Sequence, residues 1–466
     1  MDTFGKPFPR RSLLLAAGGG LLATAAPLRL VQAAASRSET RLVTESGRKA
    51  LVGSPYPETD VWTYNGDVPG PEIRLRQGER LRVVIQNNLS EATTIHWHGV
   101  RVPNAMDGVP DLTQKPIKPG ESFVYEFDVP DAGTYWYHPH EYSIEQVGRG
   151  LAGALIIDER QPPAVDRDVT WVLGDWRLKR DASIAGGFGN RMEMAMAGRI
   201  GNTVTVNGRL PDTFQVRAGE RLRLRLINAA PARLFGLTFK GHQPLVVALD
   251  GQPIEPHAPE NDRVVLGPAM RADVIVDMTG KAGERFAVVD DFYGNRAYTL
   301  IDVAYTDESP LRERPLPPPE LLPANTMPEP DLDHAERHQV RLEGGMMGGR
   351  GMGGMMSGMA WSINGVAAGG HNMSPMLTLT RDRSYILAIN NETAWYHPVH
   401  LHGHSFRVIS RNGSPTRYRE WQDTVLIPPR ESADIAFMAD NPGDWMLHCH
   451  ILDHQEGGLM AVVRVA

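Results

Sequence analysis

The chain has 466 residues, among them 36 prolines, 47 glycines and a single cysteine, and its formal net charge is −7. This length allows two to four domains with separate cores, and the absence of a block dense in lysine or arginine argues against nucleic acid as a partner. Many short Val/Leu/Ile runs between glycines and prolines favour an all-β protein rich in turns.

The N-terminus has the pattern of an export signal. Arg10-Arg11 precede an apolar run that begins at Ser12, and Ala33-Ala34-Ala35 offers a small-residue cleavage site. The pattern predicts a signal over residues 1–35, read by the twin-arginine route and cleaved near Ala35. A membrane anchor is the alternative, but alanine and glycine make the run weakly hydrophobic. We therefore expect a periplasmic protein without stable membrane insertion.

Three segments of the chain share one pattern, in which an Asn-Gly dipeptide leads to a charged turn and an apolar strand. They are Tyr64-Asn65-Gly66 before Gly78-Glu79-Arg80-Leu81-Arg82, Val206-Asn207-Gly208 before Gly219-Glu220-Arg221-Leu222-Arg223, and Ile363-Asn364-Gly365 before Arg381-Asp382-Arg383-Ser384-Tyr385. An asparagine follows nine residues after the start of each second element, at Asn87, Asn228 and Asn390. Three copies of strand, turn and strand predict three β-sandwich domains.

The repeats divide the chain into three domains and a connector. We expect domains over residues 36–160, 161–308 and 332–466, with the proline-rich segment 309–331 as a stiff, extended connector that is not packed. The strict alternation of Leu222 to Leu226 predicts a half-buried strand in the second domain. Residues 344–359 are almost entirely glycine and methionine, which favours a mobile loop.

The ends of the first and third domains repeat a second pattern. Gly133 to His140 parallels Gly443 to His450, and Thr93 to Gly99 parallels His397 to Gly403. The second domain has apolar residues at the corresponding place. Its His242 and His257 are isolated, so we expect them to be surface or structural histidines.

Four His-x-His pairs lie in these repeats, namely His96/His98, His138/His140, His400/His402 and His448/His450. The last pair flanks Cys449, and His454 follows five residues after the cysteine. Thiolate and imidazole are the donors of an electron-transfer copper site. Because alternate side chains of a strand point in opposite directions, His448 and His450 cannot point where Cys449 points. This one segment can therefore serve two metal centres. An exported chain with one cysteine forms no intramolecular disulfide, so Cys449 has another role.

These motifs resemble those of the multicopper oxidases, the family of laccases, ascorbate oxidase and bacterial cuprous oxidases, over essentially the whole mature chain. The resemblance implies three consecutive cupredoxin-like Greek-key β-sandwich domains and four copper ions. Carried over by motif, it assigns His397, Cys449 and His454 to a type 1 copper, His96 and His400 to a type 2 copper, His98, His138 and His450 to one type 3 copper, and His140, His402 and His448 to the other. Thr93 and Pro139 replace the corresponding type 1 ligands in the first domain.

The resemblance also implies a mechanism. A reducing substrate gives electrons one at a time to the type 1 copper, and Cys449 with its neighbours His448 and His450 passes them to the trinuclear cluster, where O2 is reduced to water. Asp107 matches the acidic residue that the family places near this cluster to assist proton delivery. The alternative for Asp107 is an ordinary turn aspartate.

Two positions depart from the family pattern. The type 1 axial position, ten residues after the cysteine, is Leu459, which cannot coordinate and would raise the potential. The opposing interpretation has Met460 as the axial ligand. Gln455 stands where many bacterial members have a glutamate. The sequence therefore does not decide how protons reach the cluster from that side. His404 lies beyond the ligand set and is expected to be structural.

The substrate stays open at this point. Thioether sulfur suits Cu(I), so six methionines are candidate Cu(I) ligands, namely Met346, Met347, Met352, Met355, Met356 and Met359. The alternative is a flexible loop with loose apolar cover. Leu459 favours phenolic or other organic donors, and Mn(II) is also compatible. A copper-sequestering or structural exported protein is disfavoured because every ligand position is filled. We expect a monomer.

Overall fold

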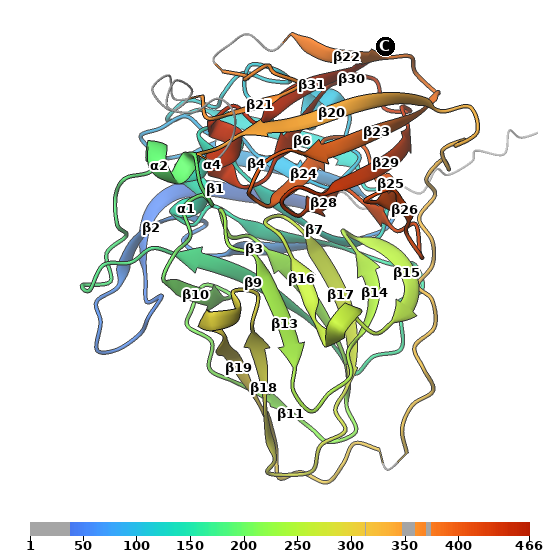
Figure 1. The fold of residues 1–466 in the computed structure, drawn as a ribbon. Helices are drawn as coiled ribbons and strands as arrows, with labels where there is room; N and C mark the ends of the chain where they lie inside the picture. Colours follow the sequence, from blue (N-terminus) through green and yellow to red (C-terminus); the bar gives the residue numbers. More distant parts are fainter. Residues whose placement is uncertain (1–37, 313, 347–358, 370–373) are drawn as a thin grey trace, which may run out of the picture. The chain divides into compact units, whose positions relative to one another are not determined.

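The computed structural model describes residues 38–312, 314–346, 359–369 and 374–466, which belong to one compact unit. The predicted export signal and most of the methionine-rich loop lie outside these residues. In the described part of the chain, no helix is long and apolar enough to cross a membrane. The prediction of an all-β protein is confirmed, because nearly all of the regular secondary structure in the described residues is strand and the helices are short (Figure 1).

The strands of the described residues form six sheets, two for each repeat, and each pair of sheets encloses its own apolar core. In the first pair, one sheet has the order β2 (Thr59–Tyr64), β1 (Ser38–Lys49), β4 (Arg80–Asn87) and β6 (Ser122–Asp128). The other has the order β3 (Gly70–Arg76), β8 (Gly153–Asp158), β7 (Gly133–His138) and β5 (His96–His98).

The second pair consists of a six-stranded and a five-stranded sheet. The six-stranded sheet has the order β10 (Thr203–Val206), β9 (Arg167–Trp176), β12 (Arg221–Asn228), β17 (Arg271–Asp277), β14 (Leu245–Leu249) and β15 (Gln252–His257). The five-stranded sheet has the order β11 (Thr213–Val216), β19 (Tyr298–Tyr305), β18 (Arg285–Asp290), β13 (Phe235–Phe239) and β16 (Val264–Leu266).

The third pair carries the C-terminal part of the chain. Its first sheet has the order β21 (Trp361–Ile363), β20 (Glu336–Gly344), β23 (Ser384–Asn391), β29 (Ser432–Met438), β25 (Phe406–Arg411) and β26 (Ser414–Pro415), with β27 (Trp421–Gln422) also paired to β25. Its second has the order β22 (Pro375–Leu379), β31 (Met460–Val465), β30 (Gly443–Cys449), β24 (His397–Leu401) and β28 (Thr424–Ile427).

Short helices occur between strands: α1 (Ser143–Gly148), α2 (Arg191–Met194), α4 (Leu452–Glu456) and the 3-10 turns η1 (Asn104–Met106), η2 (Glu260–Asp262) and η3 (Gly294–Arg296). Helix α4 contacts both α1 and α2, so it joins parts of the chain far apart in sequence.

The repeated Asn-Gly turns have one geometry. Asn65, Asn207 and Asn364 have φ of 54°, 51° and 50°, and the glycine after each also has positive φ, as a two-residue type I′ turn requires. Each asparagine side chain ties its turn to the preceding strand; Asn65, for example, accepts from the Val43 amide and donates to the Arg41 carbonyl. The turn chemistry therefore repeats with the fold.

The third repeat is displaced by one residue from the predicted alignment. Asn87 and Asn228 each use Nδ2 to bind two carbonyls after their strand, and Asn391, not Asn390, does the same in the third repeat. The reason lies in the turn, where Asp382 takes the positive φ that Gly78 and Gly219 take in the other repeats. Counting from Asp382 restores the nine-residue spacing.

One further expectation was wrong. Strand β12 is buried on both faces, because Arg223 and Arg225 pair with Asp273 and with other acidic side chains instead of facing water. The connector has no regular secondary structure, and most of its described residues are exposed or half-buried. Its Leu322 is buried, and its Asn325 binds the Ala132 backbone.

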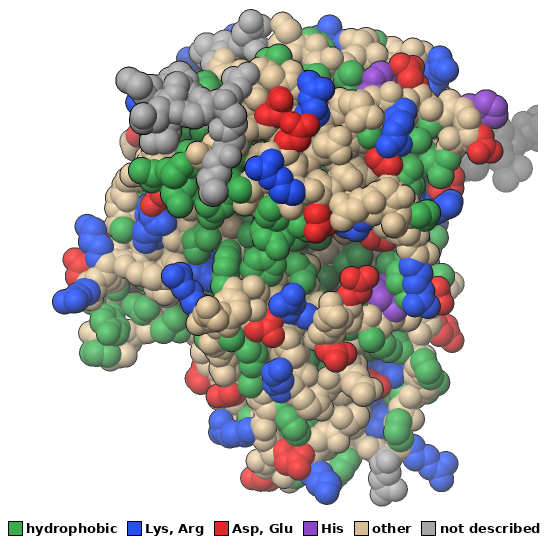
Figure 2. Space-filling model, in the orientation of Figure 1, with side chains coloured by type: hydrophobic (Ala, Val, Ile, Leu, Met, Phe, Trp, Pro, Cys, Tyr) green, Lys and Arg blue, Asp and Glu red, His purple; other side chains and the backbone are tan. Residues whose placement is uncertain are grey.

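Charged side chains of both signs are interspersed over the face that Figure 2 shows, and no large area of one sign stands out there. Acidic and basic neighbours such as Arg80 with Glu126 and Arg74 with Asp158 form ion pairs at the surface. Pairs of this kind are solvent-screened and add little stability.

Candidate metal centres

Two strand pairs place the predicted histidines opposite one another. In the first repeat, β5 runs antiparallel to β7 with His96 opposite His138, and in the third, β24 runs antiparallel to β30 with His400 opposite His448. Because the side-chain period of a strand is two, both members of a His-x-His pair on a strand face the same way. Each repeat therefore presents four imidazoles on one face.

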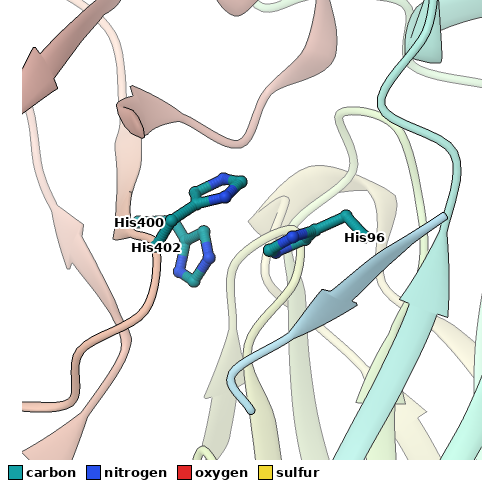
Figure 3. A group of neighbouring side chains, drawn as sticks. All are labelled: His96, His400 and His402. Atoms are coloured by element: carbon teal, nitrogen blue, oxygen red, sulfur yellow. The ribbon is translucent and has the colours of Figure 1, made fainter. Parts of the chain in front are cut away.

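The two faces meet. The His96 ring stacks on His402 with centroids 4.0 Å apart, and His98 stacks on His400 at 3.8 Å. Figure 3 shows His96 from β5 pointing toward His400 and His402, which come from β24 and the turn after it. The eight histidines of the four pairs are all buried. We call this set the eight-histidine cluster.

Nitrogen atoms within the cluster lie at metal-binding separations. Three groups have ligand atoms within 4.8 Å of one another: His96, His400 and His402; His96, His98 and His138; and His140, His402 and His448. The Nε2 atoms of His402 and His448 are 3.0 Å apart, and those of His450 and His138 are 3.3 Å apart.

The free nitrogens of the cluster fit copper. Nδ1 of His96, His138, His400, His402 and His448 faces an oxygen acceptor, so each of these rings can keep Nε2 bare for a metal. Nε2 of three rings (His96, His140 and His400) and Nδ1 of two others (His98 and His450) have no hydrogen-bond partner. Buried polar atoms without partners are costly, and a shared Lewis acid would satisfy them. Burial also lowers the pKa of His98 and most of the other rings, which keeps them in the neutral, ligating form.

Asp107 lies beside the cluster, where the sequence placed it. Its carboxylate Oδ2 accepts from His402 Nδ1 at 2.9 Å, and its carbonyl accepts from His96 Nδ1 at 2.8 Å. The other carboxylate oxygen, Oδ1, is buried without a hydrogen-bond partner.

A second aspartate, Asp423, was missed. Its Oδ1 accepts from His98 Nε2 at 3.0 Å, and its carbonyl accepts from His400 Nδ1 at 2.7 Å. Burial opposes its ionisation, but the charge and hydrogen bonds of Arg271 hold its pKa well below the usual range. In the sequence it stands between Gln422 and Thr424, away from any histidine, so no motif marked it.

A second donor group lies in the third repeat. Cys449 Sγ is 3.4 Å from His397 Nδ1 and 3.5 Å from His454 Nδ1, and the two nitrogens are 3.1 Å apart. All three side chains are buried, and burial raises the pKa of the Cys449 thiol, so a metal would have to displace its proton. One thiolate and two imidazoles fit a mononuclear copper.

Leu459 and Met460 lie on opposite faces of the chain beside this group. Leu459 is fully buried in the same apolar core as Cys449, and its carbonyl accepts from the Cys449 amide. Met460 instead lines a cavity of about 440 Å³ together with Met376 and Met446. The axial assignment itself stays a prediction.

The mononuclear group has a cover that the sequence did not reveal. His454 Nε2 donates to the Met196 carbonyl at 2.7 Å, and Trp361 packs on the His454 ring with centroids 4.3 Å apart. Trp361 in turn donates to the Met194 carbonyl. We call residues 190–200, which include α2, the cover segment. It belongs to the second repeat, which carries none of the predicted copper ligands.

The remaining candidates fall in three places. Gln455 is buried and Glu456 is exposed. His404 is buried, lies outside the two donor groups described above, and packs against Trp445. Met346 is exposed and Met359 half-buried. The other four methionines, Met347, Met352, Met355 and Met356, lie outside the described residues. His242 binds Tyr305 and His257 stacks on Tyr418, which fits structural roles.

Comparison with known proteins gives a consistent result. Family models described as "Multicopper oxidase" match residues 48–162, 167–304 and 351–466. Multicopper oxidase MmcO of Mycobacterium tuberculosis is 30% identical over 91% of this chain and 86% of its own length. The multi-copper oxidase structure from Pseudomonas thermotolerans has a TM-score of 0.83 and 37% identity, and covers 93% of this chain and 100% of that one. A Campylobacter jejuni multicopper oxidase, titled a metallo-oxidase, has a TM-score of 0.77 and 28% identity, with 92% and 91% covered. The predicted cupredoxin-like fold is confirmed.

Proposed function

The chain belongs to the multicopper oxidase family, and we propose which of its residues hold the copper ions. Members of this family are copper-dependent oxidoreductases, and this chain is one that binds four copper ions. The type 1 ligands are His397, Cys449 and His454, the type 2 ligands are His96 and His400, one type 3 set is His98, His138 and His450, and the other is His140, His402 and His448. Two of these sets have ligand atoms within 4.8 Å of one another, which supports their assignment: His397 with Cys449 and His454, and His140 with His402 and His448.

Bound copper would supply the redox chemistry, in which four one-electron oxidations of the reducing substrate are coupled to reduction of O2, with four protons, to two waters. The chain contributes the route between the two centres, since peptide bonds join Cys449 to His448 and to His450. Asp107 contributes a buried carboxylate that contacts His96 and His402, and we assign proton delivery to it. Gln455 cannot titrate, so we assign proton supply to the Asp107 side.

We propose Cu(I) as the electron donor, and the cover over His454 carries this proposal. His454 has no exposed surface and its outer nitrogen is bonded to the Met196 carbonyl, so a bulky organic donor has no direct contact with this ring. An ion that docks on the cover needs no such contact.

The cover presents the ligands that such an ion prefers. Met192 and Met346 are 48% and 40% exposed, Met196 is half-buried, and the Met346 amide donates to the Ala195 carbonyl of the cover segment. This backbone bond brings Met346 beside the segment that carries Met192 and Met196. Soft thioether sulfur favours Cu(I) over hard ions such as Mn(II).

The test is oxygen consumption with Cu(I) and with a dimethoxyphenol. A variant with Met192, Met196 and Met346 all changed to leucine should lose at least about tenfold in kcat/KM for Cu(I) and keep its phenol rate, because leucine keeps the volume but cannot coordinate. Met376→Leu, a thioether in the separate cavity, is the matched control. Equal losses with both donors would contradict the proposal.

A phenolic donor is the second candidate, and Leu459 favours it. A type 1 site without a coordinating axial residue has a higher potential, which helps to oxidise organic donors. A phenol rate far above the Cu(I) rate in the unmodified protein would select this candidate.

We also propose the domain division at residues 36–160, 161–308 and 332–466, and export to the periplasm as a monomer after cleavage near Ala35. The matched family segments and the three apolar cores support the division. Mass and N-terminal sequence of the secreted protein test the cleavage.

A further inference from the structure

The two aspartates beside the cluster are related by the repeat. Each offers its carbonyl to the first histidine of the nearby pair in its own repeat, His96 for Asp107 and His400 for Asp423. Each offers its carboxylate to the second histidine of the other repeat, His402 for Asp107 and His98 for Asp423. The cluster is therefore held across the repeats by a reciprocal pair of carboxylates.

The two carboxylates differ in what holds them. Asp107 leaves Oδ1 without a hydrogen bond. Asp423 instead receives both arms of a guanidinium, with Arg271 Nη1 at 2.8 Å from Oδ1 and Nη2 at 2.5 Å from Oδ2. A two-point guanidinium contact fixes the plane of a carboxylate, which a single hydrogen bond does not.

Arg271 comes from β17 of the second repeat, which carries none of the proposed copper ligands. Its side chain also donates to the carbonyls of Thr134 and Ala269, and its amide donates to Asp250, whose other oxygen accepts from the Asp423 and Thr424 amides. All of its polar contacts are thus made inside the protein, and its side chain has no exposed surface.

The first repeat leaves room for this ion pair. Gly99 follows His98, and a Cβ at Gly99 would lie 2.3 Å from both Arg271 Nη2 and Asp423 Oδ2. The guanidinium–carboxylate pair therefore occupies the space next to the His96-Trp97-His98 strand. Three repeats meet at this one contact.

The contact also decides which nitrogen of His98 faces the cluster. Because Asp423 Oδ1 and the Thr424 hydroxyl both lie 3.0 Å from His98 Nε2, the proton is on Nε2 and Nδ1 is left bare. The five rings with an oxygen at Nδ1 have the opposite arrangement. His98 is held in its unusual orientation by the carboxylate that Arg271 fixes.

We propose that Arg271 is a positioning residue for the copper cluster, which acts through Asp423 to fix His98 and His400. This inference rests on the proposed copper ligands. It gives the second domain a direct part in the oxygen-reducing site. Asp423 is held at both carboxylate oxygens by Arg271, whereas Asp107 Oδ1 has no hydrogen bond.

The second domain supplies a matched control. Arg223 is also fully buried and makes two carboxylate contacts, to Glu159 and Asp273, but it touches no proposed copper ligand. Substitution at Arg223 therefore reports the general cost of losing a buried ion pair.

The experiment compares Arg271→Lys, Arg271→Met, Arg223→Lys and Arg223→Met in the full chain. The readouts are copper content after loading with Cu(II), the dissociation constant of the cluster copper from chelator competition, the type 2 electron paramagnetic resonance spectrum, and unfolding of the metal-free protein. Loss of a residue that orients ligands from outside the first coordination sphere weakens metal binding about 10- to 100-fold. We expect this for Arg271→Met together with altered type 2 hyperfine splitting, an intermediate effect for Arg271→Lys, and an unchanged type 1 absorption.

For both Arg223 variants we expect the spectra and the copper content of the wild-type protein. The inference is overturned if both Arg271 variants retain the wild-type copper affinity and spectrum, or if Arg223→Met alters the type 2 spectrum equally. Should Arg271→Met not fold, Arg271→Lys decides alone, since it keeps the charge and loses the two-point contact. A wild-type protein that fails to take up four copper ions would instead refute the proposed ligand set.

Discussion

At the scale of single residues, Leu459 is the position on which we propose that the potential of the type 1 site depends. Its side chain is fully buried in the core that contains Cys449, and its backbone is bonded to both Cys449 and His454. A leucine there supplies no donor to a copper held by His397, Cys449 and His454. The potential is then set by the three strong ligands and their apolar surroundings.

Leu459→Met should therefore lower the type 1 potential, because a thioether adds a donor that stabilises Cu(II). The exchange conserves volume and should cost less than about 1.5 kcal/mol of stability. Redox titration of the blue absorption measures the potential. Met460→Leu is the control and should leave the potential unchanged, since Met460 lines the separate cavity. A fall after Met460→Leu, or none after Leu459→Met, would refute the axial assignment.

The residues that the sequence could predict are those that share a strand or a repeat. The His-x-His pairs were found because alternation places both rings on one face, and the repeat showed that two such faces exist. Asp423, Arg271 and Met196 were not found, because each contacts a residue of another repeat, His98, Asp423 and His454 respectively, and no spacing along the chain encodes such a contact. Asp107 was found only through the family resemblance.

At the scale of elements, the cover segment is the part of the second repeat that reaches the type 1 group. Helix α2 contacts α4, and the Arg199 amide donates to Asp453, next to His454. Gly198 has φ of +77°, and a Cβ there would lie 2.6 Å from Ile451 and 2.9 Å from Ala232. Only glycine allows the segment to come this close to α4.

Gly198→Ala should therefore lift the cover and destabilise the protein by about 1–3 kcal/mol, the cost of a strained backbone conformation. It should also raise the rate with bulky phenols relative to Cu(I), because His454 becomes exposed. Urea unfolding and steady-state rates measure the two effects. Gly186→Ala is the control in the preceding turn, where an added Cβ would meet nothing within 4 Å. Equal stability of the two variants would mean that the close approach of Gly198 is not needed.

Contacts between elements also explain why both faces of strand β12 are buried, although the sequence predicts one exposed face. Judged from the strand's own sequence, alternation of leucine and arginine predicts one solvent-exposed face. In the fold, Arg223 and Arg225 meet Glu159, Asp168 and Asp273, so the polar face is buried by ion pairs. Alternation identifies a strand correctly but cannot say whether its polar face meets water or another domain.

At the scale of the whole molecule, the copper cluster is a joint between the first and third repeats. His96 and His98 come from β5, His400 and His402 from β24 and the turn after it, and their rings stack in pairs. Without metal, their bare nitrogens are buried polar atoms without partners, which weakens the joint. Bound metal would convert that weakness into a cross-link.

Removal of copper should therefore loosen one region of the molecule and not the whole. A ligand that binds only the folded state stabilises it by about 2.7 kcal/mol for each site at a free concentration of about 100 times its dissociation constant. Strands β5, β7, β24 and β30 carry most of the proposed ligands, so their amides should exchange hydrogen faster in the metal-free protein. Strands β18 and β19 lie in the five-stranded sheet of the second repeat, which carries none of the proposed ligands, and should keep their rates. Hydrogen exchange is read by mass spectrometry on the copper-loaded protein, on the metal-free protein after chelation, and again after reloading with copper. Faster exchange in all strands alike would show that copper supports the fold as a whole, and no change in β5 and β24 would show that the joint between the repeats does not depend on metal.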